Sequence, residues 1–315
     1  MIFDTKTTNF KAFWIAIIML GMHNGLWAKD GLDNVYIFGD SLSDPGNVYA
    51  LTGQTAKAPY EPIPSAAYAI GGHQFSNGKT WAQRFTQNLE LNKSGKAAYG
   101  SSGKFGNYAF AGARLAGPSL AVSAADQVNL YLADQGGVAD GDALYVIQFG
   151  GNDVRDAFVA YLVDGPAAAQ TVIEAAIGAE IGLILQLYGS GAQKFLVANS
   201  PNIGLAPAVA AFGPEAQFLG TELSAAFNAG LASALDIYIR PDASVQIFDM
   251  YGLINVIAAN PVALGISDTT SPCLSFEVKS DAQCDNPETY LFWDGVHPTA
   301  VIHNHLGNVA ATLYQ

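Results

Sequence analysis

Five short apolar runs, separated by stretches with helical periodicity, constrain the fold of this chain more than any other feature. The runs are rich in β-branched and aromatic residues and show near-continuous apolar character, as expected of strands buried on both faces. Strands that alternate with helices form right-handed βαβ units. We therefore predict an α/β fold with a parallel five-stranded sheet and helices on both faces. The predicted strands are 35–38, 107–110, 144–149, 194–198 and 245–248, and the main predicted helices are 81–89, 124–133, 167–188, 217–238 and 250–258.

A polar residue or a glycine follows each predicted strand. The carboxyl ends of parallel strands lie at one edge of a sheet, which is where open α/β sheets bind their ligands. The residues that follow strands are Ser41, Gly112, Asn152, Asn199 and Asp249. Of these, Ser41, Gly112 and Asn152 are expected to converge at that edge with the C-terminal histidine loop.

Ser41 is the candidate nucleophile. It stands in a Gly-Asp-Ser-Leu turn that follows the first strand at Gly39, and a helix start follows with Asp44 as N-cap and Pro45 in the first turn. Free N–H groups at a helix N-terminus favour developing negative charge. Ser and Asp are common in turns, so this stretch alone is weak evidence for catalysis.

A serine hydroxyl needs a base within hydrogen-bond reach, and the base needs an acceptor that orients it. His297 has Asp294 three residues before it, a spacing at which the carboxylate can accept the imidazole Nδ1–H and leave Nε2 for Ser41. A capping aspartate beside an unrelated histidine explains the pair about as well when it is taken alone. The other histidines, His23, His73, His303 and His305, have no comparable acid or lie where a packing role is the default.

Three groups are candidates for the oxyanion hole, which needs donors already in place. The backbone N–H groups of Ser41 and Gly112 are two, and the side-chain amide of Asn152 is the third. A strand-ending glycine and a turn asparagine are the simpler explanation of each residue by itself. Four such elements in this order are hard to reach by chance.

The charge balance argues against several partners. The 315 residues include 14 Lys and Arg against 27 Asp and Glu, for a formal net charge of −13. Such a surface repels phosphate backbones and anionic lipid surfaces, so we expect no nucleic-acid partner and no electrostatic membrane anchor. No cofactor or metal is expected, and the chain is expected to be a monomer.

The N-terminus has the features of a signal peptide. Lysines flank an apolar run at 12–22, which is shorter than the roughly 18 residues of a membrane span. We predict a signal peptide at 1–28, with an uncleaved anchor as the alternative, and one domain at 29–315. The protein would then be secreted or periplasmic, without stable membrane insertion once the signal is removed.

Cys273 and Cys284 are the two cysteines of the chain. In an exported protein this pair predicts a disulfide that closes a local loop. No histidine stands within the loop, which makes a metal site less favoured, and two free thiols remain the other alternative.

The motifs together resemble the GDSL esterase/lipase family, also called SGNH hydrolases, from residue 34 to the C-terminus. The resemblance implies a flavodoxin-like three-layer α/β/α fold. It also implies Ser41 as nucleophile, His297 as base, Asp294 as its partner, and Ser41, Gly112 and Asn152 as oxyanion-hole donors. Phe75–Gly78 and the cysteine pair are similar to the lysophospholipase, haemolysin and choline-esterase branch. The matching blocks are Gly39–Leu42 with Ser43, Asp44 and Asn47; Asn107–Ala109 with Gly112; Gly151–Asp153; and Asp294–Pro298.

We therefore predict an exported serine ester hydrolase that acts on a small-molecule ester or lipid through an acyl-enzyme on Ser41. One alternative is a lipid acyltransferase of the same fold, in which a lipid alcohol replaces water. A second is a non-catalytic lipid- or glycan-binding protein. Aromatic loop residues are candidates for the pocket wall, although such residues as often serve packing alone. They are Tyr60, Tyr68, Phe75, Phe276 and Trp293.

Overall fold

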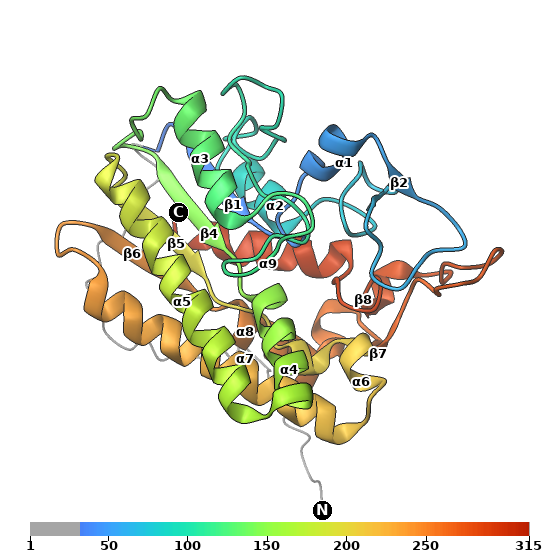
Figure 1. The fold of residues 1–315 in the computed structure, drawn as a ribbon. Coiled ribbons are helices and arrows are strands. Elements are labelled where there is room, and N and C mark those ends of the chain that lie inside the picture. The colour runs from blue at the N-terminus through green and yellow to red at the C-terminus, as the bar shows by residue number, and fades with distance from the viewer. Residues whose placement is uncertain (1–31, 315) are drawn as a thin grey trace, which may run out of the picture.

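The computed structural model describes residues 32–314, so the predicted signal peptide lies outside the described residues. Its centre is a parallel sheet in the order β1 (Val35–Gly39), β4 (Leu144–Gln148), β5 (Lys194–Ala198), β6 (Ser244–Phe248) (Figure 1). Strands β1 and β4 pair without a break, from Val35 opposite Leu144 to Gly39 opposite Gln148. The α/β class with a parallel sheet is thus confirmed.

Helices cover both faces of the sheet, because apolar side chains leave each strand on both sides. On one face, Tyr131 of α3 packs edge-on against Phe38 of β1, with ring centroids 5.6 Å apart. On the other, Trp81 of α2 stacks on Phe248 of β6 at 5.2 Å. Helix α9 packs beside α2, and α5 lies on the same side as α3 (Figure 1). The helices are α1 (Asn47–Thr52), α2 (Trp81–Asn88), α3 (Ala124–Asp134), α4 (Gly151–Asp164), α5 (Pro166–Gly189), α6 (Pro207–Ala210), α7 (Pro214–Tyr238), α8 (Met250–Ala259) and α9 (Ala300–Thr312).

The prediction of five strands was wrong, because 107–110 does not form a regular strand. It runs beside β1, to which it makes one isolated bridge, between Ile37 and Asn107. The ladder is incomplete because the side chain of Gln127 takes the Gly39 N–H: its Oε1 accepts this N–H and its Nε2 donates to the Gly39 carbonyl, both at 2.9 Å. The Phe110 N–H still donates to that carbonyl at 3.1 Å.

The first helix begins later than predicted. Helix α1 starts at Asn47 and has Gly46 as its N-cap. The carboxylate of Asp44 nevertheless accepts the N–H groups of Gly46 and Asn47, at 2.7 and 2.6 Å. Asp44 therefore satisfies the helix start from outside the helix.

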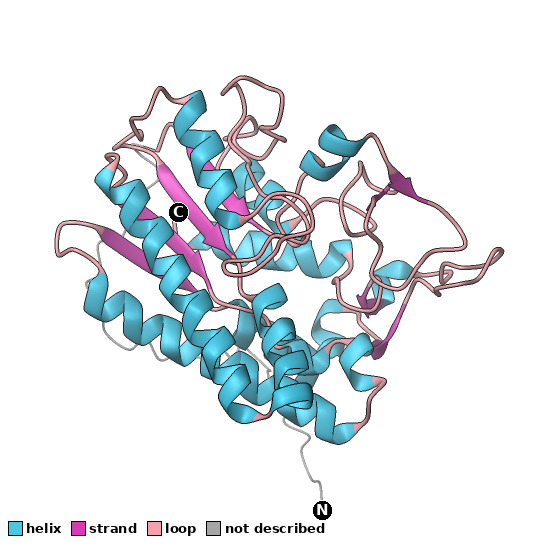
Figure 2. Ribbon diagram, in the orientation of Figure 1, coloured by secondary structure: helices cyan, strands magenta, loops and turns pink. Residues whose placement is uncertain are grey.

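A second, smaller region is rich in loops and carries two short parallel pairs (Figure 2). They are β2 (Thr55–Ala56) with β3 (Ala67–Tyr68), and β7 (Asp268–Pro272) with β8 (Tyr290–Phe292). The predicted disulfide between Cys273 and Cys284 is present and lies in a small cluster with Tyr68 and Trp293. This cluster supports the segment that leads into Asp294.

Helix α5 is long and apolar enough to span a membrane, by length and composition alone. It packs against α4 and α7, and Ile184 and Leu187 are fully buried there. Packing within the fold thus explains the buried part of this helix, which is 39% of its most apolar 18-residue window.

Candidate active site

Ser41 lies directly after β1, at the carboxyl edge of the sheet. A strand that ends in a tight turn exposes the side chain at the tip, and Ser41 is partly buried whereas its neighbours Asp40 and Leu42 are buried. Gly39 is needed at the strand end, since a Cβ there would lie 2.9 Å from the Gln148 carbonyl oxygen. Strand β4 thus fixes where the turn begins.

A buried polar network holds the turn in place. The Ser43 hydroxyl donates to Oε1 of Gln148 at 2.7 Å, and the Trp81 indole N–H donates to Ser43 at 3.0 Å. Gln148 also donates through Nε2 to Asp40 at 3.2 Å, and Asp40 accepts the N–H of Leu42 at 3.0 Å. Because buried polar groups are costly to leave unpaired, this network favours one conformation of the turn.

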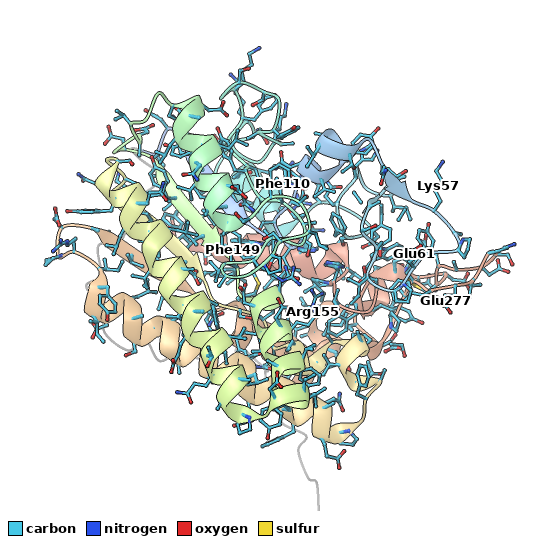
Figure 3. The ribbon with its side chains drawn as sticks, in the orientation of Figure 1. Lys57, Glu61, Phe110, Phe149, Arg155 and Glu277 are labelled. Carbon is cyan, nitrogen blue, oxygen red and sulfur yellow. A yellow bond between two sulfur atoms is a disulfide. The ribbon has the colours of Figure 1, made fainter. Side chains whose placement is uncertain are left out.

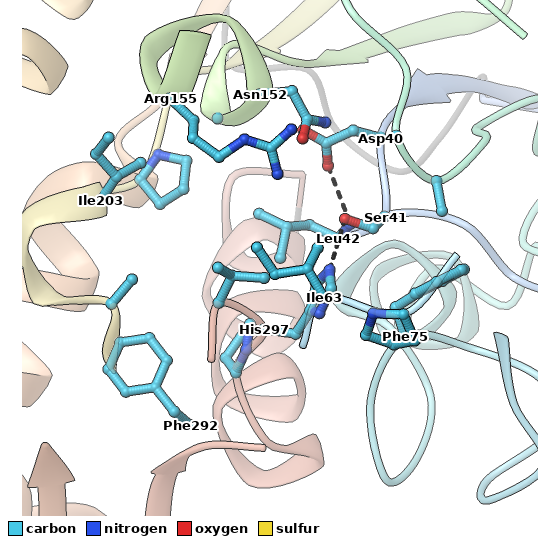
Figure 4. A pocket seen from close by; sticks show the side chains of 18 of the residues that line it. Asp40, Ser41, Leu42, Ile63, Phe75, Asn152, Arg155, Ile203, Phe292 and His297 are labelled. Atoms are coloured by element: carbon cyan, nitrogen blue, oxygen red, sulfur yellow. Dashed lines mark hydrogen bonds between the residues drawn. The ribbon is translucent and has the colours of Figure 1, made fainter. Parts of the chain in front are cut away.

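His297 and Asp294 complete a continuous hydrogen-bonded chain to Ser41. Nε2 of His297 lies 2.8 Å from the Ser41 hydroxyl oxygen, across 256 positions of sequence (Figure 4). Its Nδ1 lies 2.7 Å from Oδ2 of Asp294. An ionised carboxylate can only accept, so Nδ1 carries the proton and Nε2 of the neutral ring can accept from Ser41. This is the arrangement of a nucleophile, a base and an orienting acid.

The carboxylate of Asp294 is fully buried and fully hydrogen-bonded. Its Oδ1 accepts the N–H groups of Val296 and His297, each at 2.8 Å, and its Oδ2 also accepts the Tyr68 hydroxyl at 2.6 Å. Burial alone would raise its pKa, but the charge and hydrogen bond of His297, together with the hydrogen bonds from Tyr68 and Val296, bring the pKa below its ordinary value. Asp294 is therefore ionised at neutral pH.

Gly112 and Asn152 lie on the same cavity as Ser41. Gly112 has φ of +74°, and a Cβ there would lie 2.5 Å from the side chain of Leu120, so glycine is required. Within residues 32–314, the N–H groups of Ser41 and Gly112 donate to no protein acceptor. Asn152 is in the first turn of α4 and donates one amide hydrogen to the Ala113 carbonyl at 3.0 Å, which leaves the other available.

The cavity has a volume of about 230 Å³ and is mostly apolar. Phe75 lines it, as expected from the sequence, but Tyr68 and Trp293 pack behind it in the cluster around the disulfide. Asn199 and Asp249 also lie outside it and hydrogen-bond to each other at 2.8 Å. The apolar lining includes Val48, Ile63, Leu120, Ile203, Val209, Met250, Ile254, Leu291, Phe292 and Leu306.

Two side chains have positions at the site that the sequence did not predict. Tyr68 was expected as a pocket wall and instead contacts Asp294. Arg155 lines the cavity beside Ser41 and was not predicted at all. Its position three residues after Asn152 puts both on one face of α4, and that spacing could have identified it once the helix was known.

Metal ligation finds no support in the described part of the chain. Among residues 32–314 no three His, Cys, Asp or Glu side chains are grouped so that they could hold a metal ion. The cavity lining does bring together the Ser41 hydroxyl, the His297 imidazole and the donors of Gly112 and Asn152.

Comparison with known families decides the relationship. A family model described as GDSL-like Lipase/Acylhydrolase matches residues 35–309, which is most of the chain. The chain belongs to this family. The protein is accordingly an ester-hydrolysing serine hydrolase.

Individual relatives of this GDSL hydrolase are distant. It is 27% identical to GDSL esterase/lipase At1g29660 of Arabidopsis thaliana, over 90% of this chain and 88% of that protein. It is 22% identical to a thermolabile hemolysin of Vibrio parahaemolyticus, over 93% of this chain and 68% of that protein. A solved structure of an extracellular lipase from Streptomyces rimosus is similar with a TM-score of 0.39 and 16% identity, over 88% of this chain and 99% of that chain.

Proposed function

We propose that residues 29–315 form one exported carboxylic ester hydrolase domain that acts through an acyl-enzyme on Ser41. The observation that carries the proposal is the unbroken contact from the Ser41 hydroxyl through the His297 ring to the Asp294 carboxylate, at 2.8 and 2.7 Å. A hydroxyl becomes a useful nucleophile at neutral pH only when a base removes its proton during attack. The three side chains supply that base and its orientation.

In the first step the Ser41 oxygen attacks the ester carbonyl and its proton passes to Nε2 of His297. The carbonyl oxygen becomes an oxyanion, which the N–H groups of Ser41 and Gly112 and the Asn152 amide stabilise. His297 then gives its proton to the leaving alcohol as the ester bond breaks. The acyl group remains bound to Ser41.

In the second step water attacks the acyl-enzyme. His297 removes a proton from the water, the same three donors hold the new oxyanion, and the proton returns to the Ser41 oxygen as the acid leaves. Asp294 is ionised and stabilises the imidazolium that forms in both steps.

An ester with an apolar acyl chain suits the cavity best. Its walls are mainly aliphatic and aromatic side chains, with the polar groups gathered beside Ser41. Similarity to a hemolysin supports a lipid substrate, and the resemblance to the lysophospholipase branch points to lysophospholipids.

Export is supported by the Cys273–Cys284 disulfide, since such bonds persist in oxidising compartments. With the predicted signal peptide at 1–28 we infer a secreted or periplasmic enzyme. The net charge of −13 argues against nucleic-acid partners.

Hydrolysis of p-nitrophenyl esters from acetate to palmitate, with lysophosphatidylcholine and choline esters alongside, tests the proposal. We expect wild type to release the acid, Ser41→Ala to lose turnover, and an aryl phosphonate to label Ser41 as detected by mass spectrometry. Turnover by Ser41→Ala at the wild-type rate would overturn the mechanism. A new ester formed when cholesterol is added would identify an acyltransferase, and EDTA should leave the rate unchanged.

A further inference from the structure

Arg155 places a cation inside the cavity that the proposed mechanism does not use. It lies in the second turn of α4, three residues after Asn152, and its side chain is 30% exposed. Figure 4 shows its guanidinium between Asn152, Asp40 and the tip that carries Ser41. In Figure 3 Arg155 lies near the centre of the view, whereas Lys57, Glu61 and Glu277 lie toward the loop region.

The guanidinium has no hydrogen-bond partner in the described part of the chain, residues 32–314. Its nearest carboxylate oxygen is Oδ1 of Asp156, at 4.0 Å. That carboxylate is already occupied, because Arg114 contacts it through both Nε and Nη2. The donors of Arg155 are therefore free to bind a ligand, while those of Arg114 have a structural role.

Partial burial of an unpartnered cation is costly, and the cost is recovered when an anion binds. Arg155 is the one Lys or Arg side chain among the described residues that line the cavity. The adjacent N-terminus of α4 adds partial positive charge on the same side. The carboxyl of Asp40, which also lines the cavity, already accepts hydrogen bonds from Leu42 and Gln148.

We propose that Arg155 binds an anionic oxygen group, a carboxylate or a phosphate, carried by the ester substrate close to the scissile bond. The planar fork of a guanidinium matches the paired oxygens of either group. The preferred substrate would then combine an apolar chain along the cavity walls with an anion at α4. This inference rests on the proposed ester hydrolysis at Ser41, and it specifies the substrate class of that site.

Two matched substrate pairs test the proposal and distinguish the side on which the anion lies. The first pair is a p-nitrophenyl ester of a neutral fatty acid and the p-nitrophenyl half-ester of a dicarboxylic acid of similar length, with the charge on the acyl side. The second is a monoacylglycerol and the lysophosphatidylcholine with the same acyl chain, with the charge on the leaving group. The measured quantity is the ratio of kcat/KM for the charged member to that for the neutral member.

We expect Arg155→Met to lower this ratio at least fivefold for one of the two pairs. Arg155→Gln should do the same and remains informative if the methionine variant fails to fold. Arg155→Lys should give a smaller fall, since it keeps the charge and loses the fork. Arg240→Met is the matched control, because it removes one exposed positive charge just before β6, at the opposite edge of the sheet, and should leave both ratios unchanged.

A change of less than fivefold in both pairs would overturn the anion subsite, as would an equal fall in the Arg240→Met control. An equal loss for charged and neutral substrates would also overturn it, because Arg155 would then serve the reacting oxyanion or the fold. If Ser41→Ala retains turnover, the hydrolase mechanism and the subsite both fail. If Ser41→Ala is inactive and the Arg155 variants keep the ratio, only the subsite fails.

Discussion

The hydroxyl of Tyr68 lies 2.6 Å from Oδ2 of Asp294, the same oxygen that accepts Nδ1–H of His297. Tyr68 ends β3 and is completely buried, so a residue from the N-terminal loop region contacts the C-terminal loop across 226 positions. Burial, followed by the charge and hydrogen bond of Asp294, raises the pKa of Tyr68 far above its ordinary value. The phenol therefore stays protonated and donates a hydrogen bond. Tyr68 and His297 both donate to the same oxygen of the Asp294 carboxylate.

Tyr68→Phe removes this donor with little change of shape. We expect kcat/KM to fall roughly tenfold, as for loss of a hydrogen bond to a charged group. The acidic limb of the pH–rate profile should also move to higher pH, because the Tyr68 hydrogen bond helps to lower the pKa of Asp294, and without it the carboxylate takes up a proton at a higher pH. A pH profile of kcat/KM with a p-nitrophenyl ester measures both effects.

Tyr60→Phe is the control for Tyr68→Phe, because the Tyr60 ring packs against the Tyr68 ring, with centroids 5.7 Å apart, and within residues 32–314 its hydroxyl makes no hydrogen bond to the Asp294 carboxylate. It should leave the pH profile in place. A lower rate in Tyr68→Phe with an unchanged acidic limb would reduce Tyr68 to a packing role.

Asn152→Ala tests the oxyanion hole. The variant loses one of three donors and should reduce kcat about 10²–10³-fold, with a much smaller effect on KM. Asn199→Ala is the matched control: it alters an asparagine at another strand end that pairs with Asp249 outside the cavity. A loss of less than threefold in Asn152→Ala would remove this residue from the set of donors.

The parts of the fold that the sequence predicted are those set by local pattern. Strands β1, β4 and β5 are buried nearly throughout, so their apolar runs are continuous and easy to recognise. Ser41, Asn152 and His297 were found because each stands at a strand end or in a short motif. The predicted start of the first helix failed only by a few residues, since Asp44 caps it from outside.

The parts that were missed depend on contacts between distant segments. The ladder between 107–110 and β1 is interrupted where Gln127 of α3 takes the Gly39 N–H, a contact that no local pattern of 107–110 contains. Helix α4 was not delimited, because its glycine-rich start resembles a turn that leads directly into the long helix α5. Without α4 the placement of Arg155 beside Asn152 could not be seen.

Loss of the disulfide should loosen the active-site loop before the rest of the fold. The bridge spans a sequence separation of 11, and bridges of this kind contribute about 2–4 kcal/mol. The N–H groups of Cys273 and Leu274 bond to the carbonyls of Phe292 and Trp293, directly before Asp294. The double variant Cys273→Ser/Cys284→Ser should therefore unfold at a lower temperature and lose activity at temperatures where the fold persists.

Dithiothreitol provides the internal control for that experiment. It should reproduce both effects in wild type and have no effect on the double variant, as measured by thermal unfolding and residual activity. Equal melting temperatures for wild type and the double variant would show that the loop holds without the bridge.

Glu180 should make the stability of the protein fall as pH rises. It lies fully buried on α5, and neither carboxyl oxygen has a hydrogen-bond partner among residues 32–314. Burial, with a smaller effect from the charge of Asp153, raises its pKa well above the ordinary value. The folded chain then keeps a proton that the unfolded chain releases at the ordinary pKa of a glutamate. The contribution of Glu180 to stability is therefore fully present below this ordinary pKa. It declines as the pH rises from there toward the pKa of Glu180 in the folded chain. Glu180→Gln removes this titration. The difference in free energy of unfolding between this variant and wild type should be about zero near pH 4. By pH 8 it should favour the variant by at least about 1 kcal/mol, the equivalent of one pKa unit.

Urea unfolding at several pH values measures the difference between Glu180→Gln and wild type. Glu174→Gln is the control on the same helix, because Glu174 is exposed and its carboxylate accepts from Gln170 at 2.7 Å. Its difference from wild type should stay constant with pH. A pH-independent difference for Glu180→Gln would mean that the buried carboxyl is ionised and compensated in the folded protein, since only a proton retained on folding links stability to pH with this sign.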